Sequence, residues 1–215
     1  QEIEAKSYLD LACLGTICDM VPLIGANRVI AKRGLELLTT TPRPGLQALK
    51  RVAGVKRDVS CYDVSFGMGP RINAAGRMVH GSQVIELLTT SDAALAASVA
   101  ESLNRLNIDR QETEGKVKDL ALQQLNERYS NAGLPAGLVA YDERYHTGVV
   151  GIVAQRLVET FYRPSVVLGR DADGLLKGSV RGIKGFNVVE SLAAVSANLV
   201  KFGGHEGAGG LSLEE

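Results

Sequence analysis

"SDAALAASVAESLNRLNIDRQETEGKVKDLALQQLNERY", residues 91–129, is the stretch that decides the fold. Ser91 is a suitable helix N-cap, and apolar residues recur at helical spacing at positions 95, 99, 103 and 106, and again at 117, 120 and 125. The centre, "RLNIDRQETEGK", is almost wholly polar, so we expect it to be solvated. A helix with two apolar ends and a polar middle is typical of a rigid connector between two domains. The alternative is two ordinary helices broken near Gly115.

The residues before this connector follow a helical pattern with interruptions. Helical spacing over residues 3–14 predicts a helix that Gly15 stops, and the spacing returns over residues 28–38. Two prolines break the chain before position 45, and residues 68–78 are expected to be irregular because they hold two glycines and a proline.

The residues after the connector change to short apolar runs that alternate with helical segments. This order predicts an α/β or α+β domain. The expected strands are 136–141, 164–169, 174–182 and 208–213, and the expected helices are 147–161 and about 187–200. We therefore divide the chain into an N-terminal domain, a connecting helix and a C-terminal domain, with the ranges 1–90, 91–130 and 131–215.

The composition is that of an ordinary globular protein. Of the residues, 45% are hydrophobic and 22% are charged, and the 24 basic side chains balance the 24 acidic ones. Because no overall basic field exists, any recognition of phosphate must come from locally placed arginines. The three cysteines, Cys13, Cys18 and Cys61, form no CxxC pair, which disfavours a disulfide framework or a zinc site and fits a reducing cytoplasm.

The sequence shows no sign of a membrane span or a secretory leader. No uninterrupted apolar run approaches about 18 residues, and no basic segment precedes an apolar one at the start. The chain begins at Gln1 and enters a helical pattern at once, so we expect it to be a piece of a longer protein.

Two segments of the N-terminal domain carry groups that suit a charged ligand. Asp19 lies in the apolar run "GTICDMVPLIG", where burial would favour a metal partner; the alternative is a helix or turn cap. In "GPRINAAGR", the side chains of Arg71, Asn73 and Arg77 stand among small residues that let an anion come close. The alternative is a glycine-rich turn whose arginines pair with acids.

The C-terminal domain carries two further candidates. His146 and Thr147 precede an apolar helix whose N-terminus can hold an anion; the alternative is that Thr147 caps the helix and His146 lies on the surface. Ser179 and Arg181 are two apart on an expected strand, so they face the same way and could clamp one phosphate. A solvated sheet face would have the same pattern.

A last candidate is the glycine-rich segment "KFGGHEGAGG" at 201–210. Gly203, Gly204 and His205 could form a backbone concavity in which N–H groups and an imidazole meet a phosphate. The candidates occur on both sides of the connector, which predicts a binding cleft closed by two domains.

Six segments of this chain resemble known family signatures: "YLDLACLGTICDMVPL", "GPRINAAGRM", "LNIDRQETE", "HTGVVGIVAQRLVETFYRPSVVL", "KGSVRG" and "FGGHEGAGG". In this order, along nearly the whole chain, they resemble the RecJ family of single-strand-specific 5′→3′ DNA exonucleases in the DHH phosphoesterase superfamily. An N-terminal domain supplies most metal ligands in that family, and its Asp-His-His signature does not occur here. The resemblance implies an α/β fold made of the tail of a DHH catalytic domain, a long connecting helix, and a DHH-associated domain with a mixed sheet.

The resemblance also implies roles for single residues. Asp19 takes the place of the family's last metal-binding aspartate, and His205 is the predicted catalytic residue at the scissile end. Tyr145 stands where a Trp often precedes the histidine, and we expect it to stack on a base. The residues predicted to bind substrate phosphate are Arg71, Asn73, Arg77, His146, Ser179, Arg181, Gly203 and Gly204.

The implied reaction is phosphodiester hydrolysis with two Mn²⁺ or Mg²⁺ ions, for which this chain holds an incomplete site. The implied partners are single-stranded DNA, a single-strand-binding protein and a helicase, and no membrane is involved. The implied process is DNA repair and recombination in the cytoplasm. Two alternatives stay open. One is a DHH phosphodiesterase of short oligonucleotides or cyclic dinucleotides, and the other is a non-catalytic nucleic-acid-binding relative.

Overall fold

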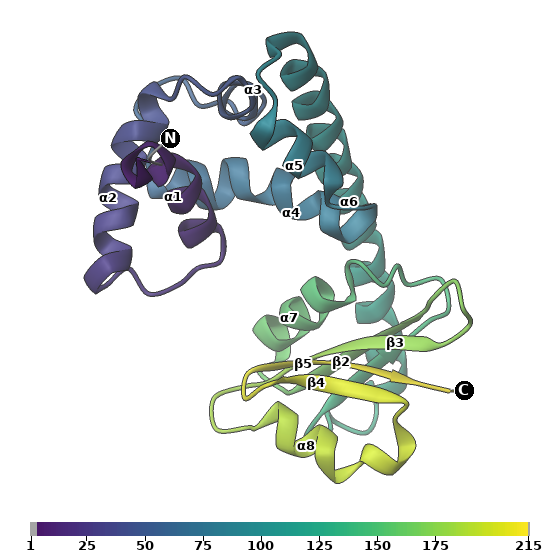
Figure 1. Cartoon of the computed structure of the whole chain (residues 1–215). Coiled ribbons are helices and arrows are strands. Elements are labelled where there is room, and N and C mark those ends of the chain that lie inside the picture. Colours follow the sequence, from purple (N-terminus) through teal and green to yellow (C-terminus); the bar gives the residue numbers. More distant parts are fainter. Residues whose placement is uncertain (1–3, 215) are drawn as a thin grey trace. The chain divides into compact units, whose positions relative to one another are not determined.

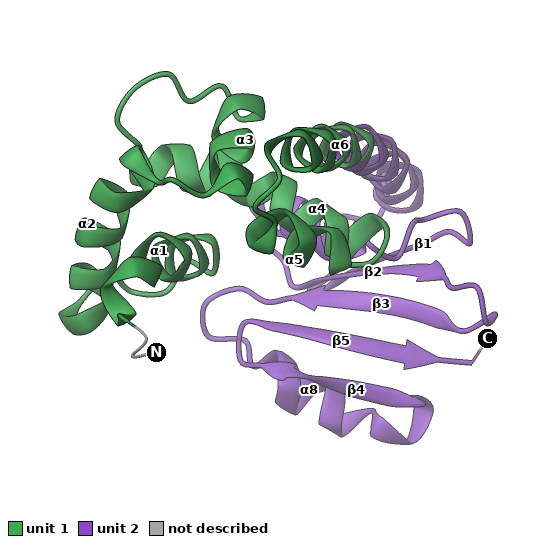
Figure 2. Cartoon of the chain, turned by 45° about the horizontal axis from the view of Figure 1, so that its top comes forward, with its two compact units in different colours: residues 1–109 green, residues 110–215 purple. Residues whose placement is uncertain are grey.

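The structure, a computed structural model, describes residues 4–214 and divides into two compact units, Gln1–Asp109 and Arg110–Glu215 (Figure 2). The division falls inside α6 (Ala93–Tyr129), a single helix of 37 residues. The prediction of one long helix is confirmed, and the alternative of a break near Gly115 is wrong. The domain boundaries at positions 90 and 130 stay an interpretation, because the two units meet within the helix.

The N-terminal unit is helical over its described residues (Figure 1). Its core contains fully buried side chains from α1, α2, α3, α5 and the first half of α6, such as Cys13, Leu38, Leu49, Leu87 and Leu103. The elements of this unit before α6 are η1 (Ala5–Tyr8), α1 (Leu9–Cys18), α2 (Gly25–Thr40), α3 (Pro44–Val52), η2 (Asp63–Met68), α4 (Gly69–Met78) and α5 (Ser82–Thr89).

Gly15 does not end the first helix, as the sequence had suggested. Ile3, where that helix was expected to begin, lies outside the described residues. The helix α1 continues through Gly15 to Cys18, and Asp19 follows as its C-cap with its N–H bonded to the carbonyl of Gly15. Met20 then adopts a left-handed conformation with φ of 55°, and this turn is what redirects the chain.

Residues 68–78 are helical, so the expectation of an irregular segment is wrong. The π-helix η2 leads directly into α4, and Pro70 sits in the first turn of α4. A Cβ on Gly69 would lie 2.8 Å from the Sγ atom of Cys18. The small side chain therefore permits close packing of the helix start against α1, rather than marking a loop.

The C-terminal unit is built on a five-stranded sheet with the order β1-β2-β3-β5-β4 (Figure 1). β1 and β2 are parallel and the other pairs are antiparallel, which confirms the predicted mixed sheet. Helix α7 packs on β2 and β3, and α8 packs on β4 and β5. The bounds are β1 (Leu138–Tyr141), α7 (Val150–Phe161), β2 (Ser165–Arg170), β3 (Leu176–Arg181), α8 (Val188–Ala194), η3 (Ser196–Asn198), β4 (Lys201–His205) and β5 (Ala208–Leu213).

The strand β4 differs from the sequence-based expectation. Gly203, Gly204 and His205 pair with β5 as an edge strand instead of forming a separate backbone concavity. Gly204 has a φ of 153°, and a Cβ there would collide with the carbonyl oxygen of Ala208. Glycine is therefore needed at this position for the β4–β5 hairpin to close.

The expectation of a solvated centre of α6 is confirmed only in part: half of residues 105–116 are exposed, and the others are buried or half-buried. Asn107 is only 4% exposed. The side chains of Arg110 and Glu114 are 14% and 13% exposed and form an ion pair, and Glu114 also accepts from Arg156 of α7 at 3.4 Å. These polar groups tie α6 to α7 within the C-terminal unit. Among the described residues, no helix is both long and apolar enough to cross a lipid bilayer.

Candidate functional site

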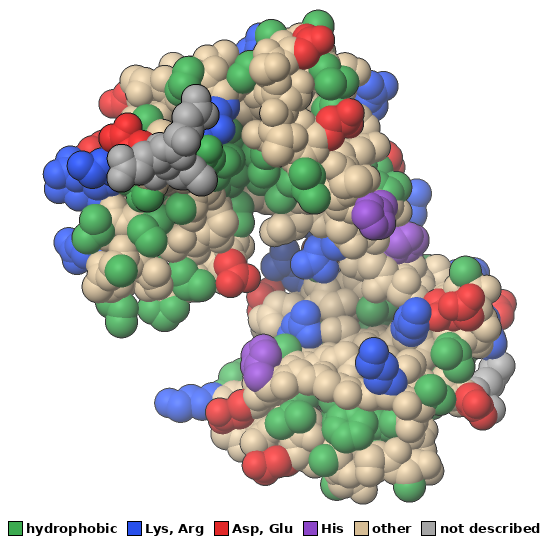
Figure 3. All heavy atoms as spheres, in the orientation of Figure 1, with side chains coloured by type: hydrophobic (Ala, Val, Ile, Leu, Met, Phe, Trp, Pro, Cys, Tyr) green, Lys and Arg blue, Asp and Glu red, His purple; other side chains and the backbone are tan. Residues whose placement is uncertain are grey.

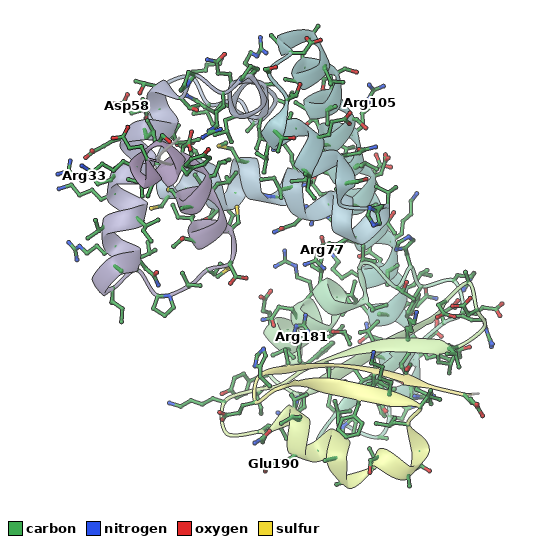
Figure 4. All side chains as sticks on the ribbon, viewed as in Figure 1. Arg33, Asp58, Arg77, Arg105, Arg181 and Glu190 are labelled. Carbon is green, nitrogen blue, oxygen red and sulfur yellow. The ribbon has the colours of Figure 1, made fainter. Side chains whose placement is uncertain are left out.

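An open hollow of about 590 Å³ in the N-terminal unit brings together three of the predicted site residues. Asp19 reaches it from the end of α1, while Asn73 and Arg77 come from successive turns of α4. All three side chains are exposed, and Figure 4 shows Arg77 projecting from α4. A carboxylate, an amide and a guanidinium around one hollow are a donor set that suits a metal-bound phosphate.

Asp19 is exposed, so the expected cost of burying its carboxylate does not arise. Its neighbour Met20 is 85% exposed in the left-handed conformation described above, and it also lines the hollow. Within residues 4–214, no group of three or more His, Cys, Asp or Glu side chains could hold a metal ion. The described residues therefore do not form such a metal site by themselves, and the role of Asp19 as a metal ligand stays a prediction.

Arg71 is used differently from Arg77, although both lie on α4. Its Nε donates to the Oδ1 atom of Asn104 at 2.9 Å, and its Nη1 donates to the carbonyl of Gly67 at 2.7 Å. Burial lowers the pKa of this guanidinium, and Glu101 partly opposes that effect. The side chain joins α4 to α6 within the N-terminal unit, and its role in binding phosphate stays a prediction.

Ser179 and Arg181 form one group on β3, as their spacing predicted. The Nη1 atom of Arg181 donates to Ser179 Oγ at 2.7 Å and to the carbonyl of Val180 at 2.9 Å. The Ser179 hydroxyl in turn donates to the carbonyl of Gly209 at 3.3 Å. Figure 4 shows Arg181 at the end of its strand.

The first turn of α7 lies directly over this pair. A Cβ on Gly151 would be 3.0 Å from both Arg181 Nη2 and Ser179 Oγ. The helix N-terminus, which carries a positive partial charge, thus approaches a guanidinium and a hydroxyl. A helix N-terminus, a guanidinium and a hydroxyl that converge in this way can bind an anion. The sequence did not predict that Gly151 lies against this pair, because contact between a helix and a strand leaves no local pattern.

The residues just before α7 are arranged otherwise than expected. Tyr145 is 2% exposed, so its ring lies in the core and the expectation that it stacks on a base is wrong. His146 is exposed, and its Nδ1 accepts from the N–H of Gly148 at 3.0 Å. The helix begins at Val150 without a side-chain cap, so the alternative in which Thr147 caps it is also wrong.

His205 lies at a second hollow, of about 400 Å³, in the C-terminal unit. The side chain is exposed at the end of β4, and its Nδ1 accepts from the N–H of Gly207 at 3.1 Å. In the neutral imidazole, the proton is therefore on Nε2, which is left to donate. Sequence reasoning missed the loop at 182–186 that lines the other side, although "RGIKG" offers a lysine between two glycines.

Comparisons with known proteins identify relatives of this chain. The family model of the DHHA1 domain matches residues 135–215. RecJ of Bacillus subtilis, a single-stranded-DNA-specific exonuclease, is 41% identical over 96% of this chain, and that of Escherichia coli is 40% identical over 96%. Crystal structures of RecJ from Thermus thermophilus with Mg²⁺ and of a RecJ bound to manganese match 99% of the chain, each at 34% identity, with TM-scores of 0.84 and 0.83.

The chain belongs to the RecJ family. It spans only part of its relatives, covering 26% of the Bacillus subtilis RecJ, 37% of the Escherichia coli RecJ, and 32% and 52% of the two crystallised chains. The DHHA1 match includes Ser179, Arg181 and both hollow-lining segments near His205, whereas the hollow at Asp19 precedes it. The RecJ resemblance therefore covers each group of candidate residues.

Proposed function

We propose that this chain is the substrate-holding part of a single-strand-specific 5′→3′ DNA exonuclease that hydrolyses phosphodiester bonds. The observation that carries the proposal is the Ser179–Arg181 pair beneath the first turn of α7, because a guanidinium, a hydroxyl and a helix N-terminus together suit a terminal phosphate. The relatives' names support single-stranded DNA as the substrate.

The two units have different tasks in this proposal. In the C-terminal unit, Arg181 and Ser179 bind the 5′-phosphate, and His205 donates from Nε2 to a phosphate oxygen nearer the scissile bond. In the N-terminal unit, Asn73 and Arg77 orient a phosphate beside Asp19. The cleft that the sequence predicts between the two domains stays a prediction. Anchoring the end in one unit would make cleavage proceed from the 5′ side.

The metal chemistry needs more than this chain supplies. The relatives were crystallised with Mg²⁺ or Mn²⁺, and we propose that Asp19 is one ligand of such an ion in the protein in which this chain functions. A bound divalent ion would activate water and stabilise charge on the scissile phosphate. Because the described residues provide only one carboxylate there, we expect the 215-residue chain alone to bind DNA without cleaving it.

The decisive test concerns Arg181 and the 5′ end. Binding of the 215-residue chain to an unpaired strand of about 20 nucleotides is measured by fluorescence anisotropy, once with a 5′-phosphate and once with a 5′-hydroxyl. Arg181→Ala should weaken binding of the phosphorylated strand by about 1.5–3 kcal/mol, or about 10- to 150-fold, with little effect on the hydroxyl strand. Arg128→Ala removes the same charge from an exposed site on α6 and serves as the control.

Equal losses on the two strands would show that Arg181 does not recognise the terminal phosphate. A dinucleotide that competes as well as the longer strand would favour the short-oligonucleotide phosphodiesterase instead. We also propose that the protein acts in the cytoplasm with a single-strand-binding protein and a helicase, which pull-down from its host would test.

A further inference from the structure

The hollow beside His205 is formed by two segments that the backbone holds together. The loop that follows β3 carries Lys184, His205 is the last residue of β4, and Glu206 begins the β4–β5 turn. Two hydrogen bonds join these segments: the N–H of Gly182 donates to Gly207, and that of Val188 donates to Glu206, each at 2.9 Å. Figure 1 shows the loop and the turn at the same end of the sheet. The position of the loop is therefore fixed by the sheet rather than left to a free chain.

Two side chains around this hollow offer hydrogen-bond donors, and only that of Lys184 has no role in the function proposed above. Lys184 is exposed and presents an ammonium group with three donors, and the neutral imidazole of His205 presents Nε2–H. Glu206 is the one acid among the residues that line the hollow. Figure 3 shows cationic, acidic and His side chains gathered at one edge of the C-terminal unit. The set is therefore able to bind an anion, with one carboxylate opposing it.

We propose that Lys184 binds a backbone phosphodiester of the unpaired strand in this hollow, next to the phosphate that His205 contacts. The inference rests on the proposed function and adds a residue to it. The lining side chains of Lys184, His205 and Glu206 are all exposed, so the hollow admits a strand that passes along it. The ammonium of Lys184 is a point charge without the planar fork of a guanidinium, so it can contact an internal phosphodiester in many orientations. The guanidinium of Arg181 is better matched to the terminal phosphate.

The test compares how much DNA binding weakens when the charge of Lys184 is removed and when the charge of a lysine outside the hollow is removed. Lys184→Gln is made in the 215-residue chain, and binding to 5′-phosphorylated and 5′-hydroxyl oligothymidine of about 20 nucleotides is followed over a range of salt concentrations. We expect binding about 5- to 10-fold weaker for both strands, and a slope of log K against log salt that is smaller by about 0.7, the value for one phosphate contact on a single strand.

Lys201→Gln is the matched control because Lys201 is an exposed lysine on β4 that does not line the hollow. It should weaken binding less than twofold with an unchanged slope. Glu206→Gln, which removes the opposing carboxylate, should tighten binding about 2- to 3-fold by the same electrostatic reasoning. Thermal unfolding of each variant checks that the fold is intact.

Two results would overturn the inference. One is a Lys184→Gln variant that binds as well as Lys201→Gln, and the other is a loss confined to the 5′-phosphorylated strand, which would make Lys184 part of the terminal site. If Arg181→Ala weakens binding while Lys184→Gln does not, only this inference fails. If the unmodified chain binds neither strand, the proposed function fails and the inference fails with it.

Discussion

The side-chain amide of Gln124 forms two hydrogen bonds with the backbone of Tyr141. Its Nε2 donates to the Tyr141 carbonyl at 2.8 Å, and its Oε1 accepts from the Tyr141 N–H at 3.0 Å. Tyr141 ends β1, which lies at the edge of the sheet, so a side chain of α6 occupies the position of a neighbouring strand there. The second half of the long helix is in this way attached to the sheet of the C-terminal unit.

Replacing Gln124 by Leu should destabilise the chain by about 1–3 kcal/mol, because two backbone groups at Tyr141 lose their partners. Urea unfolding followed by circular dichroism measures the change. Gln123→Leu is the control, since Gln123 is exposed and bonds only to Glu127 on its own helix. Equal stability of the two variants would mean that water satisfies Tyr141 as well as the amide does.

The two arginines of α4 should respond differently to the same substitution. Arg71→Gln removes the hydrogen bonds to Asn104 and Gly67 and should cost about 1–3 kcal/mol of unfolding free energy. Arg77→Gln, at an exposed position beside Asp19, should weaken binding of single-stranded DNA about 10-fold. Arg105→Gln, at an exposed position of α6, controls for the loss of charge. An unchanged stability of Arg71→Gln would contradict the linking role of its guanidinium.

Elements whose local pattern agrees with their packing could be predicted from the sequence. The strand 208–213 and the continuous helix α6 follow their expected ranges closely because alternation and helical spacing are local properties. The helix α4 could not be predicted, since glycine and proline favour turns locally. Its helical state depends on the fit of Gly69 against Cys18 from a distant segment.

The candidate site also has features that the local sequence pattern predicts and features that depend on tertiary contacts. The shared face of Ser179 and Arg181 follows from a spacing of two on a strand, so the sequence was sufficient. The approach of Gly151 to that pair, and the joining of the Lys184 loop to the His205 turn, depend on tertiary contacts between separate segments. Such contacts have no signature in a single sequence.

Gly151→Ala tests whether the first turn of α7 must stay close to the Ser179–Arg181 pair. The added Cβ, 3.0 Å from Arg181 Nη2, should push the guanidinium aside and weaken binding of a 5′-phosphorylated strand about 5- to 20-fold. Gly115→Ala is the control within a helix, because a Cβ there meets no atom within 4 Å. It should stabilise the chain by about 0.5–1 kcal/mol and leave binding unchanged.

Gly204→Ala should disrupt the β4–β5 hairpin, because its φ of 153° disfavours alanine and a Cβ would collide with the carbonyl of Ala208. A loss of about 2–4 kcal/mol in unfolding free energy is expected from the strain and the shifted strand. At Gly203, by contrast, a Cβ meets nothing within 4 Å, and Gly203→Ala should change stability by less than about 1 kcal/mol. Similar losses in both variants would show that flexibility of the strand, not the clash, is what matters.

The three cysteines should differ in reactivity and give the stability a dependence on alkaline pH. Burial raises the pKa of Cys13 to about 12 and that of Cys18 to about 11, whereas Cys61 is exposed. At pH 8, a thiol reagent should modify Cys61 quickly and the other two only on unfolding. Above about pH 9 the unfolded chain releases thiol protons that the folded chain retains, so stability should fall as pH rises toward 11, by at most about 1.4 kcal/mol per unit for each thiol. Urea unfolding at pH 8, 9 and 10 should show a smaller fall in unfolding free energy with rising pH for Cys13→Ala than for Cys61→Ser. Equal falls in the two variants would contradict burial of the Cys13 thiol as the cause.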